Sequence, residues 1–229
     1  MADIIELKHV DKVYSTGDIK TQVLFDINLT FDQGSFNSII GQSGSGKSTL
    51  MNIIGTLDKP TKGEVKVDGK PTAGMKKNEL AKLRNQTIGF VFQFHYLLPE
   101  FTAYENVLMP YWINDTKTPD KVRLRAVKLL DLVGLSKVKD NPATKMSGGQ
   151  QQRTAIARSL INNPKIILAD EPTGNLDSDS SENVYKLFRD INKRLGTTFV
   201  IVTHNRKIAE ETDRIVEIRD GRISTDIRR

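Results

Sequence analysis

Residues 41–49 read Gly41-Gln42-Ser43-Gly44-Ser45-Gly46-Lys47-Ser48-Thr49, and they lie between apolar runs at 36–40 and 50–54. The first run predicts a short buried strand, and the second predicts the opening turns of a helix. Glycines let the backbone curl so that successive N–H groups point inward, and the helix N-terminus adds a partial positive charge. A strand, a glycine-rich turn and Lys-Ser at a helix start together predict a phosphate-binding loop, and hence a nucleoside triphosphate ligand.

Each position of this loop has an expected role if the loop holds phosphates. The backbone surrounds the phosphate oxygens, the ammonium of Lys47 reaches the β- and γ-phosphates, and the hydroxyl of Ser48 binds Mg²⁺. The alternative is a glycine-rich turn that precedes a lysine by coincidence. Because every fixed position of the motif is filled and both flanks fit, we favour phosphate binding. The candidate ligand residues are Gly41, Gln42, Ser43, Gly44, Ser45, Gly46, Lys47, Ser48 and Thr49.

Composition is that of an ordinary soluble globular protein. The chain has 229 residues, which is enough for a substantial core in one large or two small domains. It has no cysteine, which excludes disulfides and thiolate chemistry and fits a reducing cytoplasm. Residues 1–6 lack the features of a signal peptide, and no run approaches the roughly 18 apolar residues of a spanning helix. We therefore expect a chain that does not itself span a membrane.

The net charge of +6 would suit attraction to nucleic acid or to an anionic membrane face. The basic residues are scattered, however, and acidic residues lie among them, as in 179–194. Some positive charge is also expected around a polyphosphate site. Charge alone therefore identifies no partner.

The stretch before the loop predicts two strands, at residues 4–10 and 22–31. Tyr14 lies between them, in the polar stretch 12–20. An aromatic ring near a nucleotide site can stack on adenine, but the spacing alone favours an ordinary core or surface tyrosine. Alternation places Val23, Phe25, Ile27 and Leu29 on one face of the second strand.

The central part of the chain differs in character from the rest. A hairpin strand at 64–67, a charged helix at 75–86 and a buried strand at 88–92 precede Gln93. Helices are then predicted at 102–112 and 119–133, without a convincing strand. We therefore expect one domain, 1–229, in which a helical subdomain at 93–162 is inserted into an α/β core made of 1–92 and 163–229.

A second candidate anion site opens the next helix. Ser147 is a good N-cap, and Gly148 and Gly149, which precede Gln150, allow an anion to approach the backbone closely. On its own, this pattern indicates a capped helix start more often than an anion site. Because the chain already has one phosphate loop, a second nest suggests a bipartite site.

Two carboxylates end the apolar stretch 166–171. Ligands of parallel α/β sheets bind at the carboxyl ends of strands. There Asp170 would hold Mg²⁺ through water, and Glu171 would orient and polarise the attacking water. The alternative is helix-capping surface charge, but so apolar a strand favours a site.

A helix at 177–195 and a buried strand at 198–202 follow, and His204 lies just after this strand. His204 would contact the γ-phosphate or the water, although without the neighbouring motifs a surface histidine is the simpler interpretation. Residues 214–218 and 222–227 predict a closing hairpin.

In this order and spacing, the motifs resemble the nucleotide-binding subunits of ATP-binding-cassette (ABC) transporters, from Ile4 to about Ile223. Met146 departs from the family pattern, in which leucine commonly opens the Ser-Gly-Gly-Gln signature, but the swap conserves volume. The resemblance implies a phosphate-loop NTPase core with a mixed sheet, an antiparallel β part and an inserted α-helical subdomain. It also implies ATP and Mg²⁺ as cofactors and ATP hydrolysis as the activity.

The resemblance further implies a head-to-tail homodimer, in which each ATP lies between the phosphate loop of one chain and Ser147–Gln150 of the other. Tyr14 would then stack on adenine, and Gln93 would ligate Mg²⁺ or the water and sense the γ-phosphate. Asp177 would cross the dimer interface, and His204 would contact the γ-phosphate.

The implied partner is a separately encoded integral membrane permease, docked near residues 93–98, with the ATPase peripheral on the cytoplasmic face of the membrane. Phe94, Tyr96 and Leu97 would suit this docking, although a local apolar core is an alternative. Residues 89–95, 97–103 and 170–178 look like those of lipoprotein-releasing ATPases and their macrolide-efflux and cell-division relatives, which act by mechanotransmission.

We therefore expect a motor for lipoprotein release or for drug or peptide export. A regulatory module of a cell-division membrane complex is an alternative. A soluble nucleic-acid-linked ABC ATPase is a third, but its long coiled coil or second cassette is missing, so we expect no nucleic-acid partner.

Overall fold

Two β-sheets form the framework of the computed structural model, which describes residues 3–115 and 117–229. The larger sheet has six strands in the order β10-β9-β3-β8-β7-β6, and its neighbours are parallel except for β10 against β9. Every residue of β3 and β8 is buried. β8 is apolar after Thr198, whereas β3 also buries the polar side chains of Asn37 and Ser38. The strands are β3 (Phe36–Ile40), β6 (Ile88–Phe92), β7 (Ile166–Asp170), β8 (Thr198–Val202), β9 (Arg214–Arg219) and β10 (Arg222–Arg228).

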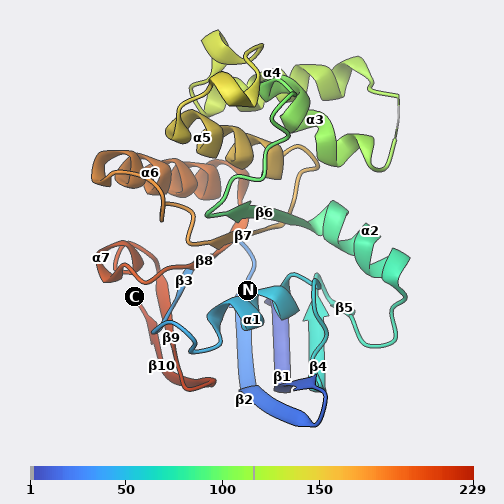
Figure 1. The fold of residues 1–229 in the computed structure, drawn as a ribbon, viewed down its shortest axis with the longest axis vertical. Helices are drawn as coiled ribbons and strands as arrows, with labels where there is room; N and C mark the ends of the chain where they lie inside the picture. Colours follow the sequence, from blue (N-terminus) through green and yellow to red (C-terminus); the bar gives the residue numbers. More distant parts are fainter. Residues whose placement is uncertain (1–2, 116) are drawn as a thin grey trace.

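The smaller sheet is antiparallel, with the strand order β2-β1-β4-β5. Together with helix α1 (Lys47–Ile54) it encloses one apolar core against the larger sheet, in which Leu50 and Met51 of α1 are fully buried. The smaller sheet lies at one end of the molecule, opposite the helices of the middle segment (Figure 1). Its strands are β1 (Asp3–Thr16), β2 (Ile19–Asp32), β4 (Lys62–Val67) and β5 (Lys70–Pro71).

The second core lies on one face of the larger sheet. It contains side chains of β3, β6, β7 and β8, of α6 and of the helices between β6 and β7. Residues 93–115 and 117–162 form helices and short 3-10 turns and contain no named strand. The cores therefore lie on opposite faces of the larger sheet, with α1 on one side and α5 on the other. The remaining helices are α2 (Lys77–Thr87), α3 (Ala103–Trp112), α4 (Asp120–Leu132), α5 (Gly148–Ser159), α6 (Ser178–Leu195) and α7 (Arg206–Ala209).

The N-terminal hairpin differs from the sequence-based expectation in two ways. The polar stretch 12–20 is not a connection, because β1 and β2 stay paired as far as Thr16 and Ile19, so Tyr14 lies within β1. Val23 and Phe25 do not share the buried face with Ile27 and Leu29. Instead Leu24 is fully buried, because the register of the strand pair shifts next to Asp26, whose φ is 48°.

The helical core predicts a large stability effect at Phe188 of α6. Its ring is fully buried and lies 5.2 Å from the ring of Phe199, so Phe188→Ala should lower the free energy of unfolding by about 3–5 kcal/mol. Urea denaturation measures this change. The control is Leu195→Ala on the same helix, which is 51% exposed and should change stability by about 0.5 kcal/mol or less. Equal effects of the two substitutions would contradict the assignment of this core.

Candidate functional site

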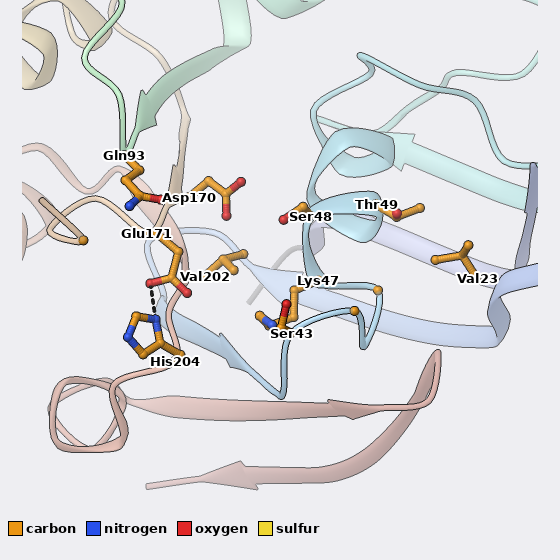
Figure 2. A pocket seen from close by; sticks show the side chains of 13 residues that line it. Val23, Ser43, Lys47, Ser48, Thr49, Gln93, Asp170, Glu171, Val202 and His204 are labelled. Atoms are coloured by element: carbon orange, nitrogen blue, oxygen red, sulfur yellow. Dashed lines mark ion pairs between the residues drawn. The ribbon is translucent and has the colours of Figure 1, made fainter.

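A cavity of about 490 Å³ lies where β6, β7 and β8 end, beside the loop that follows β3. Parallel strands bring their carboxyl ends to one edge of the sheet, so residues far apart in the sequence meet there (Figure 2). The residues that line the cavity are Val23, Ser43, Gly44, Gly46, Lys47, Ser48, Thr49, Gln93, Asp170, Glu171, Gly174, Val202 and His204. The predicted phosphate loop, both strand-end carboxylates, Gln93 and His204 therefore share one cavity.

The loop 41–46 curls tightly before α1. Gly46 has φ 105°, and a Cβ at this position would lie 2.8 Å from the Leu24 side chain, so the site requires glycine. The buried Lys47 donates from Nζ to the carbonyl oxygens of Gly41 (2.9 Å) and Gln42 (2.7 Å). Gly41 and Gln42 thus support the lysine and do not line the cavity, and Ser45 is buried behind it.

Asp170 ends β7 and faces Ser48 of α1 across the cavity (Figure 2). Burial raises the pKa of Asp170, and the charge of Glu171 raises it further, whereas the Ser48 hydroxyl and the Lys47 ammonium lower it. A half-buried carboxylate next to a second carboxylate gains from a nearby cation, because the cation offsets both the desolvation and the repulsion.

Glu171 lies one residue beyond the strand, which is shorter than the stretch 166–171 predicted from the sequence. Its backbone has φ 45°, and its N–H donates to the Val202 carbonyl at 2.9 Å. Oε2 lies 3.0 Å from Nδ1 of His204 (Figure 2). A residue other than glycine adopts this conformation at a cost of about 1–3 kcal/mol, a strain that concentrates at functional sites.

Gln93 is held in place by the segment that follows Glu171. Its Nε2 donates to Oδ1 of Asn175 (3.1 Å), and the Asn175 amide donates back to the Gln93 carbonyl (3.2 Å). A Cβ on Gly174 would lie 2.7 Å from Gln93 Nε2. Sequence reasoning did not assign roles to Gly174, Asn175, Val23 or Val202, because only the pairing of distant segments brings them to the site.

The second glycine-containing nest does not face the cavity. The Ser147 side chain caps α5 by accepting from the Gln150 N–H at 3.3 Å, and Gln150 Oε1 accepts from the Ser147 N–H at 3.0 Å. Asp177 caps α6 by accepting from Ser180, a bond that lowers the pKa of Asp177. Within the described residues, Ser147–Gln150 and Asp177 are absent from the lining of the cavity.

Tyr14 is likewise outside the cavity, at the rim of the smaller sheet. Its hydroxyl donates to Oδ2 of Asp58 at 2.8 Å, and Nζ of Lys12 lies 4.7 Å from the centre of its ring. The ring is 40% exposed, so part of it faces solvent.

The side chains that line the cavity include oxygen ligands suited to Mg²⁺. Among residues 3–115 and 117–229, no cluster of three or more His, Cys, Asp or Glu side chains could hold a metal alone. Mg²⁺ that accompanies a nucleotide needs only one or two protein oxygens, since phosphates and water supply the rest. Ser48, Asp170 and Gln93 offer such oxygens in one cavity, so the residues present fit this ion.

The sequence matches the model of one protein family. The model of the ABC transporter family matches residues 24–174. The chain belongs to this family. It is an ATP-binding-cassette ATPase, and its α/β fold with an antiparallel part and a helical insertion is the one that the resemblance implied.

Curated relatives match this ABC ATPase almost end to end. The lipoprotein-releasing system ATP-binding protein LolD 1 of Rhodopseudomonas palustris is 50% identical over 98% of this chain and 100% of its own length. The protein named LolD of Anaeromyxobacter dehalogenans is also 50% identical, over 97% of this chain and 93% of its own.

Solved structures agree with the family assignment. The dimeric post-hydrolysis state of the ATP-binding cassette MJ0796, bound to ADP and Pi, has a TM-score of 0.89, is 43% identical and covers 98% of both chains. CbiO1 from Clostridium perfringens, part of the ABC transporter complex CbiONQ, has a TM-score of 0.88 at 32% identity, over 98% of this chain and 88% of its own.

Proposed function

We propose that this ABC ATPase is the motor subunit of a lipoprotein-releasing system. The observation that carries the proposal is the 50% identity to LolD 1 over 98% of this chain and 100% of that relative. Its cavity brings together the phosphate loop and the carboxylates that such a motor needs. There are two alternatives: drug or peptide export by the same mechanotransmission mechanism, and a regulatory role in a cell-division complex. The identity of the membrane partner distinguishes them.

In the proposed reaction, the phosphate loop and Lys47 bind the phosphates of ATP, while Ser48, Asp170 and Gln93 hold Mg²⁺. When bound, Mg²⁺ neutralises charge that develops on the transferred phosphoryl group. Glu171 accepts a hydrogen bond from the attacking water and takes its proton as the water oxygen bonds to the γ-phosphorus. The bond from the γ-phosphorus to the bridging oxygen breaks, and ADP leaves with its electron pair. His204, 3.0 Å from Glu171, orients this carboxylate and contacts the γ-phosphate.

We further propose that two copies of the chain pair head to tail around two ATP molecules. This arrangement is supported by the separation of the signature nest at Ser147–Gln150 from the phosphate loop, since α5 and α1 lie on opposite faces of the sheet. The dimeric MJ0796 cassette offers a precedent for pairing. In such a dimer Asp177 crosses the interface, and the exposed part of the Tyr14 ring stacks on adenine.

The membrane partner is proposed to dock on residues 93–162, the inserted helical subdomain, beside the core made of 1–92 and 163–229. Phe94 and Tyr96 are 62% and 67% exposed, which favours docking over a local core. A neighbouring apolar groove of about 350 Å³ includes Leu57, Phe90 and Ile113. Among the described residues no helix is long and apolar enough to span a membrane. The proposed partner is a separately encoded integral membrane permease.

The proposal is tested by isolating Glu171→Gln, trapped with ATP, from native membranes and identifying the proteins that co-purify. We expect an integral membrane protein with a large extracytoplasmic domain, together with bound lipoprotein. Recovery of a cell-division or drug-efflux partner would replace the lipoprotein assignment. Recovery with ribosomes or nucleic acid, and without a membrane protein, would overturn the transporter proposal.

Gly174→Ala tests whether the position of Gln93 controls turnover. The added Cβ would lie 2.7 Å from Gln93 Nε2, so the flexible amide moves away from Asn175 while the fold persists. We expect ATP turnover to fall by about 10-fold or more, because a displacement of about 1 Å in a positioned group can lower the rate by about 100-fold. Phosphate release measures the turnover, with Gln93→Ala as the comparison. Wild-type turnover of the Gly174 variant would argue against this role.

A further inference from the structure

Tyr14 of β1 stands beside the nucleotide cavity, the cavity of about 490 Å³ that contains the phosphate loop. Thr49 and Val23 line this cavity on the side away from Glu171 (Figure 2). Burial and a hydrogen bond to Asp58 raise the pKa of Tyr14, whereas the Thr49 hydroxyl lowers it. The Tyr14 hydroxyl therefore lies close to Thr49, near the end of the cavity opposite Glu171.

The carboxylate of Asp58 fixes this hydroxyl. Its Oδ2 accepts from the Tyr14 hydroxyl at 2.8 Å, and its Oδ1 accepts from Nζ of Lys12 at 2.6 Å and from the Lys59 N–H at 2.7 Å. Burial raises the pKa of Asp58, but the hydrogen bonds from Lys12 and Tyr14 lower it below its usual value overall. The carboxylate is therefore ionised at neutral pH, and both of its oxygens are engaged as acceptors.

The ammonium of Lys12 covers one face of the Tyr14 ring. Lys12 is buried, and its Nζ lies 4.7 Å from the ring centre, within the range of a cation–π contact. Nζ also donates to the Lys59 carbonyl oxygen at 2.8 Å, so the ammonium is held by two oxygens. Because Tyr14 is still 40% exposed, the accessible part of its ring lies on the opposite face and the edge.

We propose that Asp58 is a positioning residue for nucleotide binding: with the buried ammonium of Lys12, it holds the Tyr14 ring so that the free face of the ring stacks on the base of ATP. This inference rests on the proposed stacking of Tyr14 on adenine and adds the groups that orient the ring. A ring that is already fixed loses little further side-chain entropy when the base binds, so the orientation strengthens binding.

Tyr14→Phe and Asp58→Ala test the proposal, with ATP and inorganic tripolyphosphate as ligands, because tripolyphosphate has the phosphates but no base. Calorimetric titration gives the Kd of each ligand. We expect each substitution to raise the Kd for ATP by about 5-fold, the loss expected for one hydrogen bond, and to leave the Kd for tripolyphosphate within about twofold. The double variant should also show about 5-fold, because both substitutions remove the same contact.

The matched control is Asp226→Ala on β10. Asp226 is also a carboxylate that pairs with a buried cation, Arg214, at 2.6 Å, but it does not line the nucleotide cavity. Its loss should leave the Kd of both ligands unchanged. Tyr14→Ala, measured alongside, removes the ring itself and should raise the Kd for ATP by about 10-fold or more.

The variants separate the stacking from the positioning. If Tyr14→Ala binds ATP like the wild type, the stacking on which the inference rests is wrong. If Tyr14→Ala binds ATP weakly but Tyr14→Phe and Asp58→Ala bind it normally, only the positioning role fails. Equal weakening of ATP and tripolyphosphate binding would show that Asp58 supports the fold of the site as a whole, which also overturns the inference.

Discussion

Glu171→Gln is expected to lower ATP turnover by at least about 100-fold while ATP binding persists, because general-base catalysis contributes about 10²–10⁴-fold. Glutamine keeps the shape of the side chain but cannot accept a proton from water at neutral pH. The backbone bond from the Glu171 N–H to Val202 does not involve the side chain, so the loop should keep its conformation. Phosphate release at saturating ATP measures the turnover, and a fluorescent ATP analogue measures binding.

The control for charge is Glu64→Gln, an exposed position on β4 in the smaller sheet, which should have wild-type turnover. In size-exclusion chromatography with ATP, Glu171→Gln should run as a dimer. The variant does not hydrolyse the bound ATP, so the proposed closed dimer does not open. Undiminished phosphate release would contradict the role of Glu171. Loss of ATP binding would show instead that the side chain supports the cavity.

Lys47→Ala is expected to weaken ATP binding by about 10-fold to 100-fold, which corresponds to the loss of one or more charged hydrogen bonds to phosphate. The ammonium is held by the carbonyl oxygens of Gly41 and Gln42, so it is already directed along the inside of the loop. Alanine removes both the charge that faces the phosphates and the two bonds that brace the loop. Equilibrium titration with a fluorescent ATP analogue gives the Kd.

The matched control is Lys186→Ala on the exposed face of α6. Lys186 pairs with Glu182 at 3.3 Å, and 64% of its side chain is accessible, so its loss should leave the Kd for ATP unchanged. An unchanged Kd in Lys47→Ala would reject the phosphate-loop assignment. A fall in the unfolding midpoint together with a rise in the Kd would show that part of the effect comes from the loop itself.

Local sequence patterns predicted much of the fold and of the cavity. The strand at 36–40, the loop at 41–49 and the helix after it are contiguous in the chain, and the structure has β3, the loop and α1 there. The strand before Asp170 was equally visible, because residues 166–169 are all apolar and buried. Burial and backbone chemistry within a few residues suffice for such predictions.

The remaining features depend on partners that are distant in the sequence. The pairing of β1 with β2 and the shift beside Asp26 exchanged Val23 for Leu24 on the buried face, and alternation along one strand contains no sign of that shift. The amide pair between Gln93 and Asn175 joins segments 82 positions apart. Tyr185 has the spacing of an ordinary core residue of α6, and only the fold places it at a second cavity that Glu171 also lines.

The chain leaves the larger sheet at Phe92 and returns at Ile166 in the adjacent strand, and β6 and β7 are paired in parallel along their whole length. Everything between these strands is thus a single excursion whose two ends meet. The chain entropy lost on closing such an excursion grows only with the logarithm of its length, by about 0.6 kcal/mol for each doubling. Insertions in the connecting loops between Gln93 and Lys165 therefore cost the sheet little chain entropy. In evolutionary terms, the exposed loops that would face a membrane protein can lengthen while the strands that carry the nucleotide residues stay as they are.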